Sequence, residues 1–403
     1  MTRRTFFEFL GTGLCVLAGS LVIAGSRVQV ILRKVRGRLK AYSSLPSGGV
    51  EQQVVELPRE GERVSVERAL NSRCSSDYDN DPEIFHWGMF DTSARLSSNQ
   101  VDRIVRLAER CRLSERGTRV ETDQEALTFS ADAAELEHAR EARMIESGMQ
   151  QQAVCLVCAA LGAALVFDSQ GPDGTYLSNQ HFVATKMRLG AMKPSYGKSF
   201  WSTAAPENER PWLTGNLPDP KRDSQAPLLM AIEDFQPNRK DGARATLSDV
   251  SQLLWAARGR TPHLYKSNPW GLTIPTWQGL QNISSVHVAA SSKLYQYVNW
   301  KNGRPTHRIE AEATAMEVDH LQHLAPGTDC FLVLTTDEAH TRALWEVGYQ
   351  LLNIILQARA LGLSYRTQVL SEKDRLGFAG MSRGTPVAMV ALRAANERLL
   401  ESI

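Results

Sequence analysis

The feature that most constrains the fold of this chain is a helical segment that occurs twice. Residues 146–162 align without a gap with residues 346–362, at an offset of 200 residues, and seven of the seventeen positions are identical. An internal duplication explains this better than the alternative, in which two long helices share ordinary helical composition. Both copies have an apolar face and end in Ala-Leu-Gly, which predicts helices closed by a left-handed glycine. The identical pairs are Glu146/Glu346, Gly148/Gly348, Gln150/Gln350, Leu156/Leu356, Ala160/Ala360, Leu161/Leu361 and Gly162/Gly362.

Length and composition indicate an ordinary folded protein of two or three domains. The chain has 403 residues, of which 42% are hydrophobic and 22% charged. A net charge of +2 gives no global basic field, so nucleic acid is not an expected partner. The nine histidines and six cysteines show no paired metal-ligand spacing. We therefore predict no metal site.

The one CxxC pair, Cys155 and Cys158, lies inside the first copy of the repeat between apolar residues. Redox pairs of this spacing usually occupy a helix N-terminus, where the thiolate is stabilised. Of the two interpretations, a redox pair and two buried core cysteines, the sequence favours the core.

Residues 1–42 differ from the rest of the chain and predict an export signal or a membrane anchor. Arg3 and Arg4 precede an apolar stretch, and the surrounding residues resemble the twin-arginine motif of folded-protein export. Residues 24–26 are small enough for cleavage, while residues 11–30 are long enough to span a bilayer if they are retained. The sequence predicts export to the periplasmic side and leaves cleavage and anchoring open.

The remaining chain divides by composition into four parts. Residues 43–63 read as a polar linker, and residues 201–243, rich in Pro, Asn and Asp, as a connecting segment. Residues 64–200 and 244–403 each read as helices, a sheet, a long helix and a strand, which predicts an α+β plan used twice.

Local patterns predict the elements within both halves. The clearest helix is 96–108, with Ser97 or Ser98 as its cap. A short helix begins near Val64, a helical pair covers 130–162, and further helices cover 245–257 and 313–324. Strands are expected at 164–167, 181–189, 284–290, 293–298, 330–335 and 387–392.

Several of these segments resemble the nitroreductase superfamily of flavin mononucleotide (FMN) oxidoreductases. The second half is most similar to the branch of dehydrogenases that oxidise azoline rings in peptide natural products. The resemblance rests on residues 253–259 (LLWAARG), 273–276 (TIPT), 294–297 (LYQY) and the Glu-x-Gly, Asn353 and Ala-Leu-Gly pattern of 346–362. In the first half, Arg73-Cys74-Ser75 stands where family members carry an Arg-Arg-Ser motif. The resemblance is weak over 64–198 and moderate over 244–392.

The resemblance implies two tandem nitroreductase-like halves, each a mixed or antiparallel sheet packed with long helices, joined as an intrachain pseudo-dimer. In this family the flavin lies between two protomers and takes ligands from both. The first half keeps the arginine motif and lacks the proline-serine loop, while the second half has the opposite pattern. The resemblance therefore implies a single composite FMN site. Its expected ligand residues are Arg73, Ser75, Glu146, Gly148 and Lys193 from the first half and Pro275, Thr276, Trp277 and Asn282 from the second.

The expected activity is electron transfer to or from a small organic substrate, with a quinone or an electron-carrier protein as the other partner outside the cytoplasm. Three departures from the family pattern favour an alternative: Ser72 replaces the first arginine, Thr276 replaces a serine, and Trp277 replaces a small residue. The alternative is a degenerate, non-catalytic module that binds flavin or holds a partner. No catalytic residue is predicted from the sequence.

Overall fold

The structure is a computed structural model. It describes residues 53–54, 62–72, 91, 93–115, 117–123, 126–168, 176–177, 181–183, 186–192, 213–262, 270–275, 283–290, 293–312, 318–337, 341–375, 378, 384–395 and 399–400. The predicted signal at 1–42 lies outside these residues. Within the described part of the chain, no helix combines the length and apolar character needed to cross a membrane.

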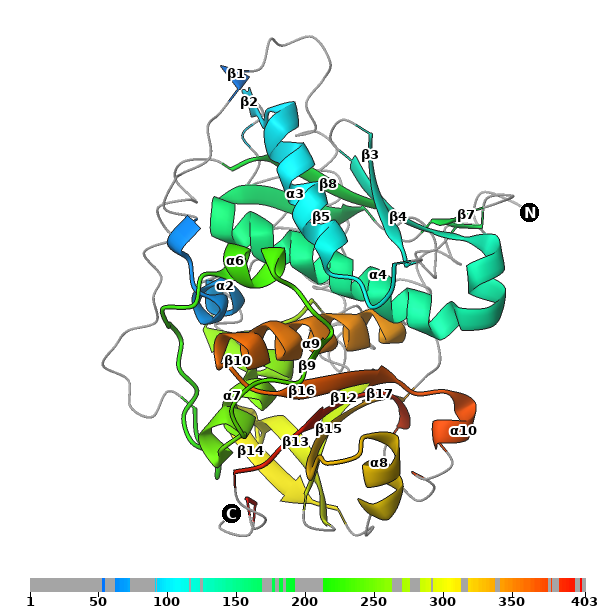
Figure 1. Ribbon diagram of the computed structural model, residues 1–403. Coiled ribbons are helices and arrows are strands. Elements are labelled where there is room, and N and C mark those ends of the chain that lie inside the picture. Colours follow the sequence, from blue (N-terminus) through cyan, green and yellow to red (C-terminus); the bar gives the residue numbers. More distant parts are fainter. Residues whose placement is uncertain are drawn as a thin grey trace, which may run out of the picture.

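Two long helices lie side by side at the centre of the molecule, between two sheets (Figure 1). These are α4 (Ala133–Leu161), which bends at Ala139, and α9 (Thr341–Ala360). The main apolar core is continuous across both helices and includes the fully buried side chains of Phe129 and Trp345. The two halves of the chain therefore share one core.

The sheet of the second half has seven antiparallel strands in the order β14-β13-β12-β15-β17-β16-β9. Its central strands are buried, as expected of strands covered on both faces: α9 packs on one face, and Leu321 of α8 (Val318–Leu324) lies in a smaller apolar cluster with Phe331 and Val333 on the other. The strands are β9 (Asn238–Arg239), β12 (Ser284–Ala290), β13 (Lys293–Lys301), β14 (Arg304–Ala311), β15 (Cys330–Thr336), β16 (Tyr365–Val369) and β17 (Thr385–Leu392).

The sheet of the first half has the order β5-β8-β4-β7-β6, with β3 also paired to β4, and is antiparallel throughout. Two small pairs complete the strands: β1 with β2, and β10 with β11. The strands are β1 (Gln53–Val54), β2 (Ala94–Arg95), β3 (Arg119–Asp123), β4 (Ala126–Asp132), β5 (Ala163–Asp168), β6 (Tyr176–Leu177), β7 (His181–Val183), β8 (Lys186–Ala191), β10 (Arg260–Pro262) and β11 (Trp270–Leu272).

The two halves contain the same unit in the same chain order. The first half contains β4, α4, β5 and β8 in this order, with β6 and β7 between the last two. The second contains β15, α9, β16 and β17, with α10 between the last two. The sheet order is β5-β8-β4 in one and β16-β17-β15 in the other, with both pairings antiparallel. The expected helices and antiparallel sheets of an α+β protein are thus present.

Local capping explains where several helices begin and end. Ser97 caps α3 (Ser98–Arg110) in a capping box with Gln100, and Thr246 caps α7 (Leu247–Arg258) in the same way. Gly162 and Gly362 follow the two long helices with positive φ angles of 73° and 68°, as the sequence predicts. The shorter helices are α2 (Val66–Ser72), α6 (Leu228–Glu233), α8 (Val318–Leu324) and α10 (Glu372–Arg375).

The connecting segment expected at residues 201–243 contains a helix and a strand of its own. Within it, α6 packs on α3, α4 and α9, and β9 forms the edge of the second sheet by pairing with β16. Leu228 also donates its backbone N–H to Val64. The segment therefore joins the two halves by packing as well as by sequence.

Candidate functional site

The central helices cross at the two repeated glycines. A Cβ atom built on Gly148 would collide with the carbonyl oxygen of Trp345 and lie 2.8 Å from its Cα. A Cβ atom on Gly348 would collide with the carbonyl oxygen of Ile145 and lie 2.9 Å from the Cα of Gly148. The contact is reciprocal, because the same offset of 200 residues relates both pairs. The absence of side chains at these glycines permits close backbone approach.

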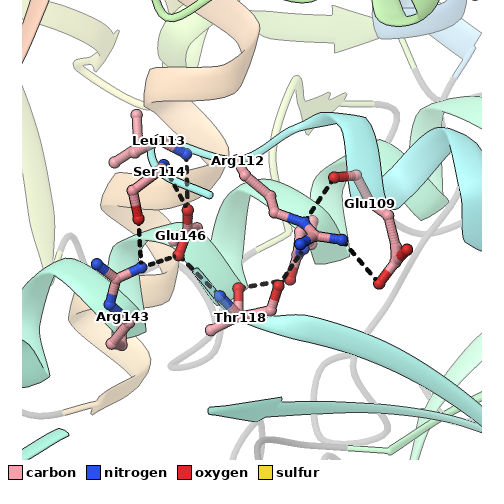
Figure 2. A network of polar contacts seen from close by, with 8 residues as sticks. Glu109, Arg112, Leu113, Ser114, Thr118, Arg143 and Glu146 are labelled. Atoms are coloured by element: carbon pink, nitrogen blue, oxygen red, sulfur yellow. Dashed lines mark hydrogen bonds and ion pairs between the residues drawn. The ribbon is translucent and has the colours of Figure 1, made fainter. Parts of the chain in front are cut away.

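Glu146 organises the loop that follows α3 (Figure 2). Its side chain is fully buried, and its carboxylate accepts backbone hydrogen bonds from Leu113 (2.7 Å), Ser114 (3.2 Å) and Thr118 (2.9 Å). Arg143 Nη1 lies 2.5 Å from Glu146 Oε2 and compensates the buried charge. The chain at Gly117 also needs glycine, because a Cβ there would collide with this carboxylate.

Glu346, the second copy of this residue, holds different partners. Its carboxylate lies 2.9 Å from Arg258 Nη1 and accepts a hydrogen bond of 2.8 Å from the Ser284 hydroxyl. Gln350 Nε2 donates to the same hydroxyl oxygen at 2.8 Å. The repeated Glu and Gln therefore fix strand β12 in the second half, while Glu146 and Gln150 fix the loop before β3 in the first.

A cluster of amides from both long helices anchors the segment that leads to Pro275. Gln152 of α4 donates to the carbonyl oxygen of Thr273 at 3.0 Å and to Asn353 Oδ1 at 2.9 Å. Asn353 of α9 donates to the same Thr273 oxygen at 3.2 Å and to the carbonyl oxygen of Ala256 at 2.9 Å. Gln152 and Asn353 are fully buried. A side chain of the first half thus positions a loop of the second.

In the opposite direction, a side chain of the second half positions a helix of the first half, α2, which ends just before Arg73. Glu67 of α2 is buried and accepts 2.6 Å hydrogen bonds from Gln357 Nε2 of α9 and from the Ser224 hydroxyl. α2 also packs against β10, whose partner β11 leads to Pro275. Helix α2 belongs to the first half and the segment 270–275 to the second. They lie near each other because α2 packs on β10, the strand that pairs with this segment.

A second polar cluster lies where α7 meets β13 and β14. His307 Nδ1 lies 2.8 Å from the Tyr297 hydroxyl, and His307 Nε2 lies 2.6 Å from the Ser251 hydroxyl. Burial lowers the pKa of His307 to about 3 and raises that of Tyr297, so both groups are neutral near pH 7. The cluster therefore contributes hydrogen bonds to the core and no charge.

The structure describes three of the predicted ligand residues. Glu146 and Gly148 are buried at the helix crossing and serve the internal contacts given above. These contacts give both residues a role other than facing a flavin. Pro275 is buried at the end of the anchored segment. The remaining residues, Arg73, Ser75, Lys193, Thr276, Trp277 and Asn282, lie outside the described residues.

The amide and carboxylate anchors Gln152, Gln357 and Glu67 were not predicted from the sequence. A signal for the first was present, because residues 150–152 are three consecutive glutamines inside an otherwise apolar helix. Buried amides require partners, so such a run predicts an internal polar contact. Its partner, a backbone carbonyl 121 residues away, could not be read from the pattern.

Both cysteines of the CxxC pair are buried in the core. Burial, together with the neighbouring Cys155, raises the pKa of Cys158, which disfavours the nucleophilic thiolate. The prediction of core cysteines is confirmed. Among the described residues, no group of His, Cys, Asp and Glu has the arrangement of a metal site.

No protein-family profile matches the chain, and no curated protein matches it. Several solved structures are similar in part, and two of them are candidate nitroreductases. A candidate nitroreductase from Ralstonia eutropha JMP134 is 22% identical over 45% of this chain and 89% of its own, with a TM-score of 0.34. A candidate nitroreductase from Anabaena variabilis ATCC 29413 is 11% identical over 67% of this chain and 69% of its own, with a TM-score of 0.45.

Proposed function

We propose that this chain is an FMN-dependent oxidoreductase of the nitroreductase type, in which two fused halves form one composite flavin site. The observation that carries the proposal is the crossed anchoring of the two halves. Gln357 of the second half holds α2, and Gln152 of the first half holds the Thr273–Pro275 segment. A dimer of such halves would exchange the same contacts between subunits, so an internal duplication explains them.

The residues that follow these anchored segments suit a phosphorylated flavin. Arg73 follows α2 directly, and Thr276 follows Pro275. A guanidinium, the Ser75 hydroxyl and the Lys193 ammonium form a donor set suited to a phosphate. The packing of α2 against β10 is compatible with ligands reaching one site from both halves.

Bound FMN would supply hydride or single-electron transfer through its ring system. In our proposal Arg73, Ser75 and Lys193 hold the phosphate, and Pro275, Thr276 and Asn282 line the ring. The indole of Trp277 would stack on or block one face of the flavin ring, and would thereby limit substrate access to it. Glu146 and Gly148 act one step away, since Glu146 fixes the loop at residues 113–118 and Gly148 permits the close crossing of α4 and α9.

The proposal includes one flavin per chain. The loop between α3 and β3, residues 111–118, is short, and Glu146 occupies three of its backbone N–H groups. The corresponding region of the second half, residues 259–283, includes the β10-β11 hairpin and Pro275. The first half thus offers few free backbone donors for a second flavin.

We further propose that the protein acts on the outer side of the cytoplasmic membrane, exported or anchored through residues 11–30. This rests on Arg3 and Arg4 ahead of the apolar stretch. Nicotinamide nucleotides are not the expected partner there, so the electron partner is a quinone or an electron-carrier protein. A reporter that matures only after folded export, fused to residues 1–45, should lose its signal when both arginines become lysine.

A second candidate function is a non-catalytic module that binds flavin or holds a partner protein. The observation that favours it is the complete burial of Glu146 and the close helix contact at Gly148, which leave neither residue open to a ligand. The module would show no turnover with nitroaromatics or quinones after reduction of any bound flavin.

Flavin stoichiometry tests the proposed site. The purified protein should show the two near-visible flavin bands, with one FMN per chain, and Arg73→Ala should lose the flavin. Arg63→Ala is the matched control, because Arg63 is an exposed arginine just before α2 and should leave the content unchanged. A protein that stays colourless after incubation with FMN would refute the flavin proposal, and two flavins per chain would refute the single site.

A further inference from the structure

Arg260 is a buried arginine at the junction of α7 and β10. Only 5% of its surface is exposed, and its carbonyl oxygen accepts a hydrogen bond of 3.1 Å from the indole nitrogen of Trp255. It also pairs with Leu272 across the β10-β11 ladder. The backbone of Arg260 is therefore held by the core, and its side chain occupies a defined place.

The guanidinium of Arg260 has no anionic partner among the described residues, and its Nε atom makes no hydrogen bond. Arg258, two residues earlier, shows the usual arrangement, with the Glu346 carboxylate 2.9 Å away. Among the described residues, the cluster of Arg258, Glu346 and Arg260 therefore carries one net positive charge. A buried charge without a partner is costly, so a natural chain rarely keeps one without a use.

The neighbours of the guanidinium do not supply the missing charge. Its central carbon lies 4.6 Å from the ring centroid of Trp300, a cation–π contact. The nearby Tyr297 is neutral, because burial raises the pKa of its hydroxyl. Burial and the charge of Arg258 lower the pKa of Arg260 to about 10, which still leaves it protonated at pH 7. The site keeps a full cation beside an indole and a neutral phenol.

Trp300 provides the link to solvent. Its side chain is exposed, at 37%, as few large apolar side chains in the described part of the chain are, and it lies next to an irregularity in the pairing of β13 with β14. An exposed side chain at an irregular strand position can change rotamer without disturbing the core. Because this exposed indole lies directly against the guanidinium, its displacement would open a path for a small ion.

We propose that Arg260 binds a small oxyanion, the carboxylate or phosphate group of a small molecule, beside Trp300 and Tyr297. The planar guanidinium offers parallel N–H donors to two oxygens of such a group. The anion neutralises the excess charge, and the indole covers one side of the pair. The inference does not depend on a bound flavin.

The test measures the thermal midpoint of unfolding of the flavin-free full chain against anion concentration. Inorganic phosphate and acetate form two arms, each compared with chloride at equal ionic strength. We expect a saturable rise in at least one arm, since a ligand specific to the folded state stabilises it. The arm that responds assigns the phosphate or the carboxylate class.

Two variants and one control attribute the effect to the proposed residue. Arg260→Met keeps the apolar stem against Trp300 and should raise the midpoint in chloride while abolishing the response. Arg260→Lys keeps the charge without the planar fork and should weaken the apparent affinity at least tenfold. The control Arg304→Gln removes an exposed arginine from the same strand pair and should leave the response intact.

Three results would overturn the proposal. The first is a wild-type midpoint that follows chloride in both arms. The second is a response in Arg260→Met equal to that of wild type. If Arg260→Met does not fold, Arg260→Lys decides, and an unchanged affinity in that variant is the third.

Discussion

Replacing Gly148 by alanine should destabilise the protein, although alanine is the better helix former. In an open helix the change would gain about 1 kcal/mol. Here the new Cβ would collide with the carbonyl oxygen of Trp345 and lie 2.8 Å from its Cα. Both atoms belong to the backbone, so no rotamer change can relieve the contact. The two helices must move apart.

The loss of stability in Gly148→Ala can be estimated from the distance by which α4 and α9 must separate. Carbon atoms pack at about 3.5–4.0 Å, so the helices must separate by roughly 1 Å. A gap of this size forfeits about a quarter to a half of the dispersion energy of each contact it opens. Overpacking of cores typically costs about 1–3 kcal/mol, and a rigid backbone contact belongs at the upper end. After the propensity gain, we expect a net loss of about 2 kcal/mol.

Urea unfolding of the full chain measures this loss as a shift of the midpoint with an unchanged slope. Gly348→Ala should show a similar loss of stability. The double variant should lose less stability than the two single variants added together, because the helices separate only once. The control Gly327→Ala has open space around its Cβ and a φ of 77°, so it should show only the strain of a left-handed alanine, about 1 kcal/mol. A more stable Gly148→Ala protein would refute the close crossing.

Further predictions concern the buried polar groups. Glu146→Gln should lower the free energy of unfolding by about 3–5 kcal/mol, because it leaves the charge of Arg143 without its carboxylate partner. It should also speed amide exchange in residues 113–118. The control Glu109→Gln, at a partly exposed carboxylate, should lower the free energy of unfolding by about 1 kcal/mol or less. The folded-state pKa of His307, about 3, lies below its unfolded value, so stability should fall as the pH drops from about 6.5 towards 3, by up to about 5 kcal/mol. His307→Asn should flatten that part of the urea-midpoint profile, and an unchanged profile would contradict the assignment. Cys155 and Cys158 should resist a thiol reagent in the folded protein and react in urea; rapid labelling of the native chain would contradict their burial.

Elements set by short-range patterns could be predicted from the sequence. The helix capped by Ser97 and the strand β12 at residues 284–290 lie where expected, as do the left-handed glycines after both long helices. In each case the cause lies within a few residues: a capping side chain, the alternating valines Val286 and Val288, or a glycine after an apolar helix.

Other elements depend on distant partners and could not be predicted. Residues 130–132 were expected to begin a helix and instead end strand β4, because they pair with β7 more than forty residues later. The edge strand β9 exists through its pairing with β16. No local pattern marks such a pairing.

The same limit applies to the site. Glu146 and Gly148 were selected from the repeat and from the family resemblance, but their contacts are with the loop at 113–118 and with Trp345. The repeat indicates that two residues matter without indicating what they contact. Arg260 belongs to no sequence motif. That its guanidinium is buried without an anionic partner among the described residues is visible only in the structure.

The crossing of α4 and α9 has a consequence for how this molecule can vary. In a dimer of identical subunits, a mutation at a symmetric interface occurs on both sides at once. Here the two helices belong to one chain, so Ile145 can face a partner helix that carries Trp345 at the equivalent position. Each side can change independently, and dilution cannot separate them, because the covalent link keeps their local concentration fixed. One side can therefore specialise for chemistry while the other is kept for support.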